Sequence, residues 1–122
     1  MKRAQPEAAL HKAVAHYLPM VLAPEVVWTT VGHGGGGKVR GAQLKAMGLR
    51  AGWPDIQLMW RYGNATRVLC IELKSASGRL EPEQRACADD LERAGAIVLV
   101  ARSLDAVKGI LEGANVPRKV TS

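Results

Sequence analysis

The sequence predicts a domain of the α/β class, in which helices flank a mixed β-sheet. Two segments rich in β-branched and large apolar residues, 52–60 and 68–74, are joined by a break that contains Gly63-Asn64, a pair that suits a tight hairpin. A helical segment then leads to the apolar stretch 96–101, and a strand–helix–strand unit of this kind pairs its strands in parallel. The expected order of elements is α-β-(α)-β-β-α-β-α.

A first helix is expected from Pro6 to the residue before Pro19, because proline suits the first helical position and ends a helix that reaches it. One face of this helix is apolar, with Leu10, Val14, Tyr17 and Leu18. Extended backwards, the stripe reaches Glu7. Periodicity alone leaves open whether this carboxylate complements the helix dipole or needs a partner in the interior. His11, one turn on, is interpreted as a surface side chain, with Glu7 or DNA as its alternative contacts.

Residues 26–31 predict a strand, and the glycine-rich segment 32–41 predicts a mobile loop that carries Lys38 and Arg40. The segment lacks the Gly-Lys-Ser/Thr of a P-loop. Because it interrupts a small domain, we expect it to become ordered on a phosphate backbone rather than to act as a linker. The role of His33 stays open. Residues 42–47 predict a short helix that ends at Gly48, and Lys45 and Arg50 continue the positive charge.

The second half of the chain predicts two helices around one strand. Pro82 opens a helix that runs to Ala94 and ends at Gly95, with Gln84 in its first turn. The residues alone favour an ordinary solvated side chain for Gln84. The stretch 96–101 is apolar throughout and is therefore expected to be a central strand. Ser103 can cap the last helix, which carries Leu104, Val107 and Leu111.

The whole chain, 1–122, is expected to be a single domain with its core at about 6–112, followed by a basic and disordered tail, 113–122. No apolar run approaches the length of a membrane span, and the N-terminus lacks the apolar core of a signal peptide, so an intracellular, cytoplasmic location is expected. The two cysteines, Cys70 and Cys87, are interpreted as reduced structural thiols. The three tryptophans are interpreted as core or interface residues.

The hairpin predicts a cluster of charged side chains. Closed symmetrically at Gly63-Asn64, it puts Asp55 directly opposite Glu72, with Cβ atoms roughly 4.5–5.5 Å apart. Strand alternation puts Lys74 on the same face as Glu72. Glu-x-Lys on a strand is commonly a solvated face, but a Pro-Asp opposite it favours a site. Two close carboxylates need a cation or a shared proton, and hard oxygen ligands suit Mg²⁺ or Mn²⁺.

These residues carry a resemblance to a known family. Pro54-Asp55 followed by Glu72-Leu73-Lys74 resembles the PD-(D/E)xK nuclease signature. With Gly52-Trp53 before it, and Gly78 and Gln84 after it, the set is similar to the virus-type replication–repair nuclease (VRR-NUC) domain, from about Glu7 to about Leu111. The resemblance implies a restriction-endonuclease-like core.

The resemblance also implies roles for particular residues. Asp55, Glu72 and the backbone carbonyl of Leu73 would bind Mg²⁺ or Mn²⁺, and Glu7 would help to hold a second metal or its water shell. Lys74 would orient the attacking water or stabilise the charge that develops on the phosphate. Gln84 would position water or phosphate.

The function that this implies is metal-dependent hydrolysis of DNA phosphodiester bonds. A net charge of +6 and a pI near 9.8 agree with a nucleic-acid partner, contacted through the four basic residues upstream of the motif: Lys38, Arg40, Lys45 and Arg50. Short domains of this family resemble Holliday-junction resolvases, so branched DNA, a role in DNA repair and a homodimer are expected, with a phage as one source. A non-cleaving DNA-binding module and a nuclease for flaps or RNA remain the alternatives.

Overall fold

The computed structural model describes residues 5–31 and 37–120. The helices and strands in chain order are α1 (Gln5–Val21), β1 (Val27–Thr30), α2 (Gly37–Ala46), β2 (Ile56–Tyr62), β3 (Ala65–Leu73), α3 (Pro82–Arg93), β4 (Ile97–Ala101) and α4 (Leu104–Gly113). This is the predicted order. Among the described residues, no helix has both the length and the apolar character that a membrane span requires.

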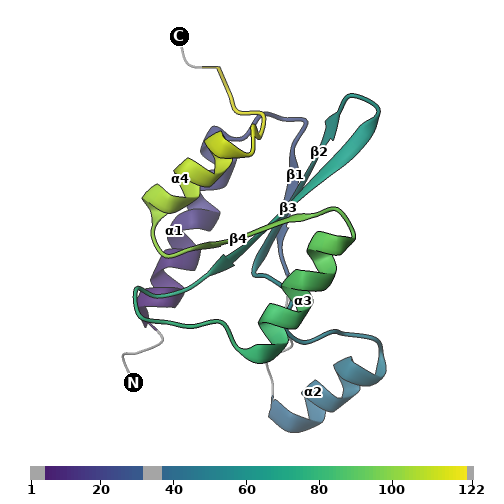
Figure 1. Cartoon of the computed structure of the whole chain (residues 1–122). Coiled ribbons are helices and arrows are strands. Elements are labelled where there is room, and N and C mark those ends of the chain that lie inside the picture. The colour runs from purple at the N-terminus through teal and green to yellow at the C-terminus, as the bar shows by residue number, and fades with distance from the viewer. Residues whose placement is uncertain (1–4, 32–36, 121–122) are drawn as a thin grey trace.

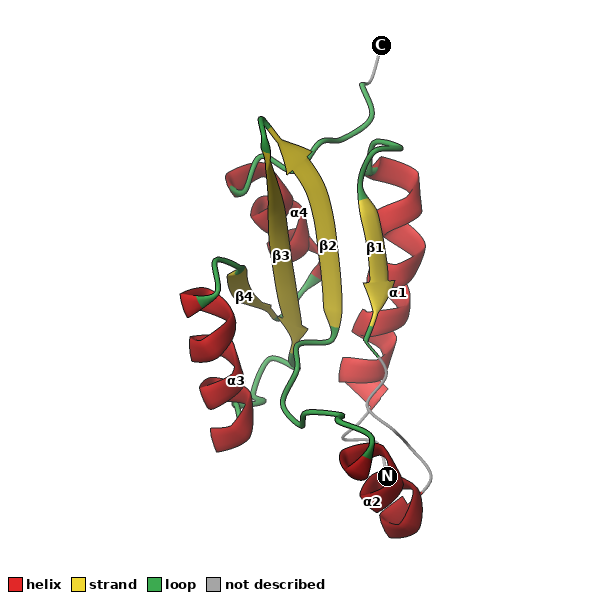
Figure 2. Cartoon of the chain, turned by 90° about the vertical axis from the view of Figure 1, so that its right-hand side faces the viewer, coloured by secondary structure: helices red, strands yellow, loops and turns green. Residues whose placement is uncertain are grey.

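The four strands form one mixed sheet in the order β1-β2-β3-β4. The β1–β2 and β2–β3 pairs are antiparallel, and the β3–β4 pair, joined through α3, is parallel. Helices α1 and α4 pack against each other on one face of the sheet, and α3 lies on the other face (Figures 1 and 2). Helix α2 projects from the end of the sheet at which β2 begins and β3 ends. The predicted α/β class with a mixed sheet is confirmed.

The β2–β3 hairpin has the predicted register, with Ile56 opposite Ile71 and Tyr62 opposite Ala65. Gly63 has a φ of 63°, so the turn uses the positive backbone angle that glycine adopts without strain. Strand alternation then sends one set of side chains into the main core, formed with α1 and α4: Ile56, Leu58, Trp60, Leu69, Ile71 and Leu73. The residues between them point to the other face of the sheet, where Cys70 is buried and Glu72 contacts Gln84 of α3.

The first helix does not end before Pro19, as predicted, but runs through it to Val21. Proline removes one backbone hydrogen bond inside a helix. Here the last turn is held from outside, because Lys119 donates to the Pro19 carbonyl through Nζ (3.2 Å) and to the Val21 carbonyl through its backbone N–H (2.8 Å). Burial of Leu18 and Leu22 fixes the same turn against the core.

The disorder predicted for the C-terminal tail is wrong for its described part, 113–120. Two residues after α4 the chain reverses at Asn115, whose φ is 56°, and the Val116 N–H donates to the Leu111 carbonyl at 3.0 Å. Val116 is only 2% exposed and belongs to the core. Arg118 then forms a β-bridge with Leu22 at the end of α1. The basic composition of this segment gave no sign that Val116 anchors it in the core.

Two further expectations differ from the structure. The apolar strand β4 is an edge strand of the sheet rather than a central one. Its side chains are apolar on both sides because α3 covers one face and α4 the other. The predicted basic loop is also partly helical, since α2 begins at Gly37 and therefore carries Lys38 and Arg40. The rest of that predicted loop, 32–36 with His33, lies outside the described residues.

Candidate functional site

Asp55 and Glu72 lie at the same end and on the same face of the sheet. Asp55 immediately precedes β2, whose register with β3 places it beside the last residues of that strand. The Asp55 carboxylate accepts a hydrogen bond from the Leu73 backbone N–H at 2.7 Å. The backbone carbonyl of Asp55 accepts a second one from the Val31 N–H at 2.8 Å. The carboxylate is therefore fixed relative to both neighbouring strands.

Glu72 is buried among polar partners. Its side chain accepts a hydrogen bond from Gln84 Nε2 at 3.0 Å and lies 3.5 Å from Lys74 Nζ. Glu72 is 4% exposed and Lys74 is 8% exposed. Burial raises the pKa of Glu72 to about 7, the Asp55 charge adds to this rise, and Lys74 opposes it. A carboxyl group with this pKa can lose its proton to solvent near neutral pH, and a cation can then take the proton's place.

Helix α3 brings Gln84 to the carboxylate pair. Its amide oxygen accepts a hydrogen bond from the Glu81 N–H at 2.8 Å, which leaves the amide nitrogen for Glu72. The turn before Asp55 packs tightly on this part of α3. Gly52 has a φ of 89°, and a Cβ atom there would lie 2.4 Å from the Glu83 carbonyl oxygen. The glycine of the Gly52-Trp53-Pro54-Asp55 motif thus allows two segments of the site to touch.

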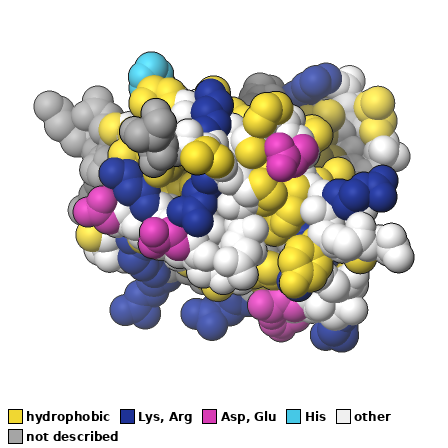
Figure 3. All heavy atoms as spheres, turned by 90° about the horizontal axis from the view of Figure 1, so that it is seen from above, with side chains coloured by type: hydrophobic (Ala, Val, Ile, Leu, Met, Phe, Trp, Pro, Cys, Tyr) yellow, Lys and Arg dark blue, Asp and Glu magenta, His cyan; other side chains and the backbone are white. Residues whose placement is uncertain are grey.

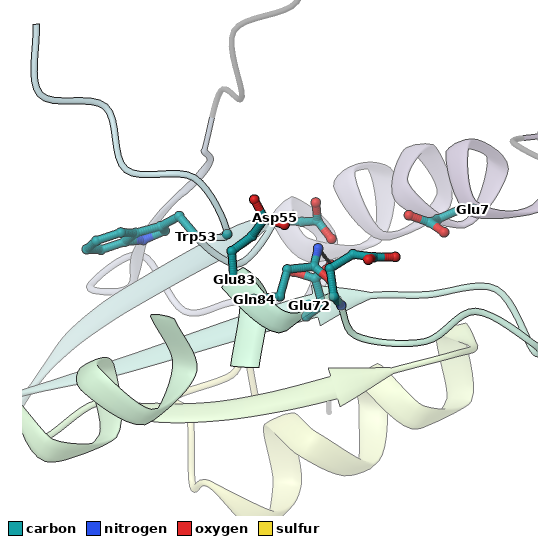
Figure 4. A pocket seen from close by; sticks show the side chains of 8 residues that line it. Glu7, Trp53, Asp55, Glu72, Glu83 and Gln84 are labelled. Atoms are coloured by element: carbon teal, nitrogen blue, oxygen red, sulfur yellow. Dashed lines mark hydrogen bonds between the residues drawn. The ribbon is translucent and has the colours of Figure 1, made fainter. Parts of the chain in front are cut away.

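Two adjacent hollows meet at Asp55 and Glu7. We call the first the acidic hollow: it measures about 190 Å³ and is lined by Gln84 and five residues with carboxylate side chains, Glu7, Asp55, Glu72, Glu81 and Glu83. Figure 4 shows Glu7 on α1, across from Glu72 and Gln84. The second, the histidine hollow, measures about 270 Å³ and is lined by Glu7, Ala8, His11, Asp55 and Leu73. Sequence reasoning preferred an ordinary surface position for His11.

The side chains present fit a hard divalent cation. Among the described residues, no three His, Cys, Asp or Glu side chains are close enough together to hold an ion by themselves. Mg²⁺, however, usually takes one or two protein carboxylates and keeps several waters. Asp55 and Glu72 supply two such carboxylates, close enough for one to raise the pKa of the other. Glu7 borders both hollows beside Asp55, and Leu73 borders the histidine hollow.

The four basic residues predicted to contact nucleic acid fall into two groups. Lys38, Arg40 and Lys45 are exposed on α2, at the same end of the molecule as the carboxylates. Arg50 is engaged by α3: its guanidinium donates to Asp90 at 2.7 Å, and this hydrogen bond lowers the pKa of Asp90. Arg50 therefore ties the segment before Gly52 to α3, a contact that charge counting does not reveal.

Trp53 and Gln57 form a contact that the sequence did not indicate. The Trp53 indole N–H donates to Gln57 Oε1 at 3.0 Å, which fixes the ring beside the acidic hollow. Trp60 and Trp28 instead belong to the main core or pack against it. The prediction of core or interface tryptophans holds for these two, while Trp53 borders the site.

Comparisons with known proteins identify the family and the fold of the chain. The family model of the VRR-NUC domain matches residues 1–105. A solved structure described as a VRR_NUC domain protein is 19% identical, with a TM-score of 0.68 over 92% of this chain and 90% of its own. None of the curated proteins compared with this chain matches it. The fold is therefore of the nuclease type, and the chain belongs to the VRR-NUC domain family.

Proposed function

We propose that this protein is a metal-dependent nuclease that hydrolyses phosphodiester bonds of branched DNA, such as a Holliday junction. The observation that carries the proposal is the environment of Glu72. One buried carboxylate lies next to Asp55 and is contacted by an amide, Gln84, and an ammonium group, Lys74. Metal-dependent hydrolysis of a phosphodiester requires carboxylates that bind the metal ion and a positively charged side chain next to them.

Each residue has a proposed task. Asp55 and Glu72, with the Leu73 carbonyl, hold Mg²⁺ or Mn²⁺, and Glu7 holds a second ion or the water shell of the first. A bound ion of this kind polarises the scissile phosphate and lowers the pKa of a coordinated water. Lys74 places its positive charge where negative charge develops on the phosphate. Gln84 fixes Glu72 and offers its amide to water or phosphate.

The positive charge near this site supports a nucleic-acid substrate. Helix α2 presents Lys38, Arg40 and Lys45 at the end of the molecule that holds the carboxylates, so a phosphate backbone that reaches the site passes these side chains. The described part of one chain has a single such site, whereas a four-way junction is cut symmetrically by two. We therefore propose a homodimer as the active form.

The test is a panel of linear, nicked, flap and four-way-junction DNAs and a structured RNA, each incubated with and without Mn²⁺. We expect metal-dependent cleavage with preference for the junction. Lys74→Met should cut at least about a hundredfold more slowly, because losing one preorganised donor typically costs about 10²–10³ in rate.

The matched control is Lys108→Met, on α4, which should cut like the wild type. DNA affinity should be alike for all three proteins. Circular dichroism should show each of them folded, although Lys74→Met loses the buried contact with Glu72 and should be less stable. Normal cleavage by Lys74→Met would refute its role. If the wild type cuts nothing in the panel but binds DNA, the domain is a non-cleaving binding module.

A further inference from the structure

The histidine hollow differs in charge from the acidic hollow, although the two share Glu7 and Asp55. Beyond the shared pair, the acidic hollow adds Glu72, Glu81 and Glu83. The histidine hollow adds His11, Ala8 and Leu73, none of which is acidic. A metal ion would neutralise part of the charge on Asp55 and Glu72, but Glu81 and Glu83 have no part in holding it. Beyond the scissile phosphate, a DNA strand is therefore repelled more strongly on the acidic side than on the other.

His11 is held in a defined place in this second hollow. It lies one helical turn after Glu7 on α1, so the two side chains are neighbours on one face. Its Nε2 atom lies 3.2 Å from the Thr30 hydroxyl oxygen. Thr30 ends β1 and pairs with Ile56, the residue after Asp55. The imidazole ring is thus positioned relative to Asp55 through a strand pair and one hydrogen bond.

An imidazole in this position can bind phosphate. Either ring nitrogen can carry a hydrogen and donate it to an oxygen, and Nδ1 is the nitrogen that does not contact Thr30. The hollow is about 270 Å³, which leaves room for a phosphate with its sugar. His11 is half-buried, so a ligand reaches it directly.

We propose that His11 is a substrate-binding residue: it contacts the DNA phosphate next to the scissile one, and the strand passes through the histidine hollow rather than the acidic hollow. The inference rests on the proposed nuclease function for the identity of its ligand. According to this proposal, the bound DNA strand runs from the carboxylate pair toward α1.

The direct test observes the histidine rings by nuclear magnetic resonance while the trinucleotide dTpdTpdT, which carries both a scissile phosphate and its neighbour, is added in the presence of Ca²⁺. We expect the His11 ring signals to shift and those of His16, exposed on the same helix, to stay in place. Thymidine, which lacks phosphate, should shift neither ring. An unmoved His11 signal, or equal shifts at His16, would overturn the proposal. Because no cleavage is needed, this readout stands even if the nuclease function fails.

Kinetics supply the second test. His11→Ala should raise KM for the preferred DNA about ten- to hundredfold, the range expected for a hydrogen bond to a charged group, and leave kcat nearly unchanged. His11→Gln keeps an N–H donor and should recover part of the affinity. Thr30→Val, which releases the ring, should give a smaller rise, and His16→Ala none. A fall in kcat with KM unchanged, or loss of metal binding without DNA, would instead make His11 part of the catalytic or metal-binding set and refute the phosphate contact.

Discussion

Glu72 is a buried carboxyl group whose neighbours shift its pKa in opposite directions. Burial and the charges of Asp55 and Glu7 favour the neutral acid, and Lys74 favours the carboxylate. The result is a pKa of about 7, well above the ordinary value of 4.5. Without a bound cation, ionisation of Glu72 lowers the stability of the folded protein. A cation bound there removes the cost, so burial of the acid favours a metal complex over the empty site.

The sign of this effect gives a prediction for metal-free protein. The folded state binds the Glu72 proton more tightly than the unfolded state, so its contribution to stability is complete below pH about 4.5 and is lost as pH rises through about 7. Over that window the free energy of unfolding should fall by up to about 3 kcal/mol from this group. Chemical denaturation of wild type and Glu72→Gln over a pH series isolates the contribution.

Glu72→Gln should lack this pH-dependent component, because its side chain does not titrate. Mg²⁺ should raise the melting temperature of the wild type more above pH about 7 than below it, since protons compete with the ion for Glu72. Identical pH profiles for the two proteins would show that Glu72 titrates as an ordinary surface acid.

At the level of single residues, the position of the carboxylate pair could be predicted from the sequence. A two-residue turn at Gly63-Asn64 fixes the register of the whole hairpin, and the register places Asp55 beside Glu72. The Arg50–Asp90 ion pair and the contact of Gly52 with α3 could not be predicted, because both join segments whose packing is decided by the whole fold.

At the level of elements, α1 and the C-terminal segment support each other. The Ala23 N–H donates to the Pro117 carbonyl at 3.0 Å, and Lys119 bonds the last turn of α1. These contacts join residues that are far apart in the sequence. Local sequence patterns therefore could not predict the end of α1 or the docking of the C-terminal segment. Pro19 and a polar tail are correct local signals for a helix end and for disorder, and tertiary packing overrides both.

Valine substitutions in this segment test the anchoring. Val116→Ala should lower the free energy of unfolding by about 1–3 kcal/mol, because it opens a cavity in the core where Val116 is 2% exposed. The matched control is Val120→Ala, since Val120 is 96% exposed and its substitution should change stability by less than about 0.5 kcal/mol. Urea denaturation measures both. Equal effects would mean that the segment does not dock in solution.

Helix α2 is the element most suited to contact DNA, but positive charge is not confined to it. Figure 3 views the opposite end of the molecule and shows Lys and Arg side chains there as well. The difference lies in position. Lys38 and Arg40 lie at the carboxylate end, whereas Arg61 and Arg67 lie beside the hairpin turn at the far end of β2 and β3.

Two double variants of equal charge separate position from net charge. Lys38→Ala/Arg40→Ala should weaken DNA binding and flatten its dependence on salt concentration, because each lost phosphate contact removes released counterions. Arg61→Ala/Arg67→Ala should change both much less. Fluorescence anisotropy over a salt series measures this. If the two variants behave alike, DNA responds to the total charge and α2 has no special part.

At the scale of the whole molecule, β4 leaves one edge of the sheet open. It pairs with β3 on one side only among the described strands. Beside it runs an apolar groove of about 470 Å³ between the strand and the last helix, lined by Ile97, Leu99, Ala106, Gly109, Ile110, Gly113 and Ala114. Leu99 is 39% exposed. The helices on the two faces of β4 leave Leu99 partly exposed, and a partner at this edge would cover it.

The last prediction is that a second copy of the chain covers this edge in the homodimer. Two β4 strands related by a two-fold axis can pair antiparallel and continue the sheet, which also satisfies backbone groups that an isolated edge exposes. Leu99→Lys should then give a monomer by light scattering and abolish paired cuts in a four-way junction, while single-strand nicking by each monomer persists. Met20→Lys is the matched control, because Met20 is a comparably exposed apolar residue on α1, at 56%, and its substitution should leave the dimer intact. A wild-type protein that stays monomeric at micromolar concentration, with and without DNA, would rule out the dimer and favour substrates that need a single cut.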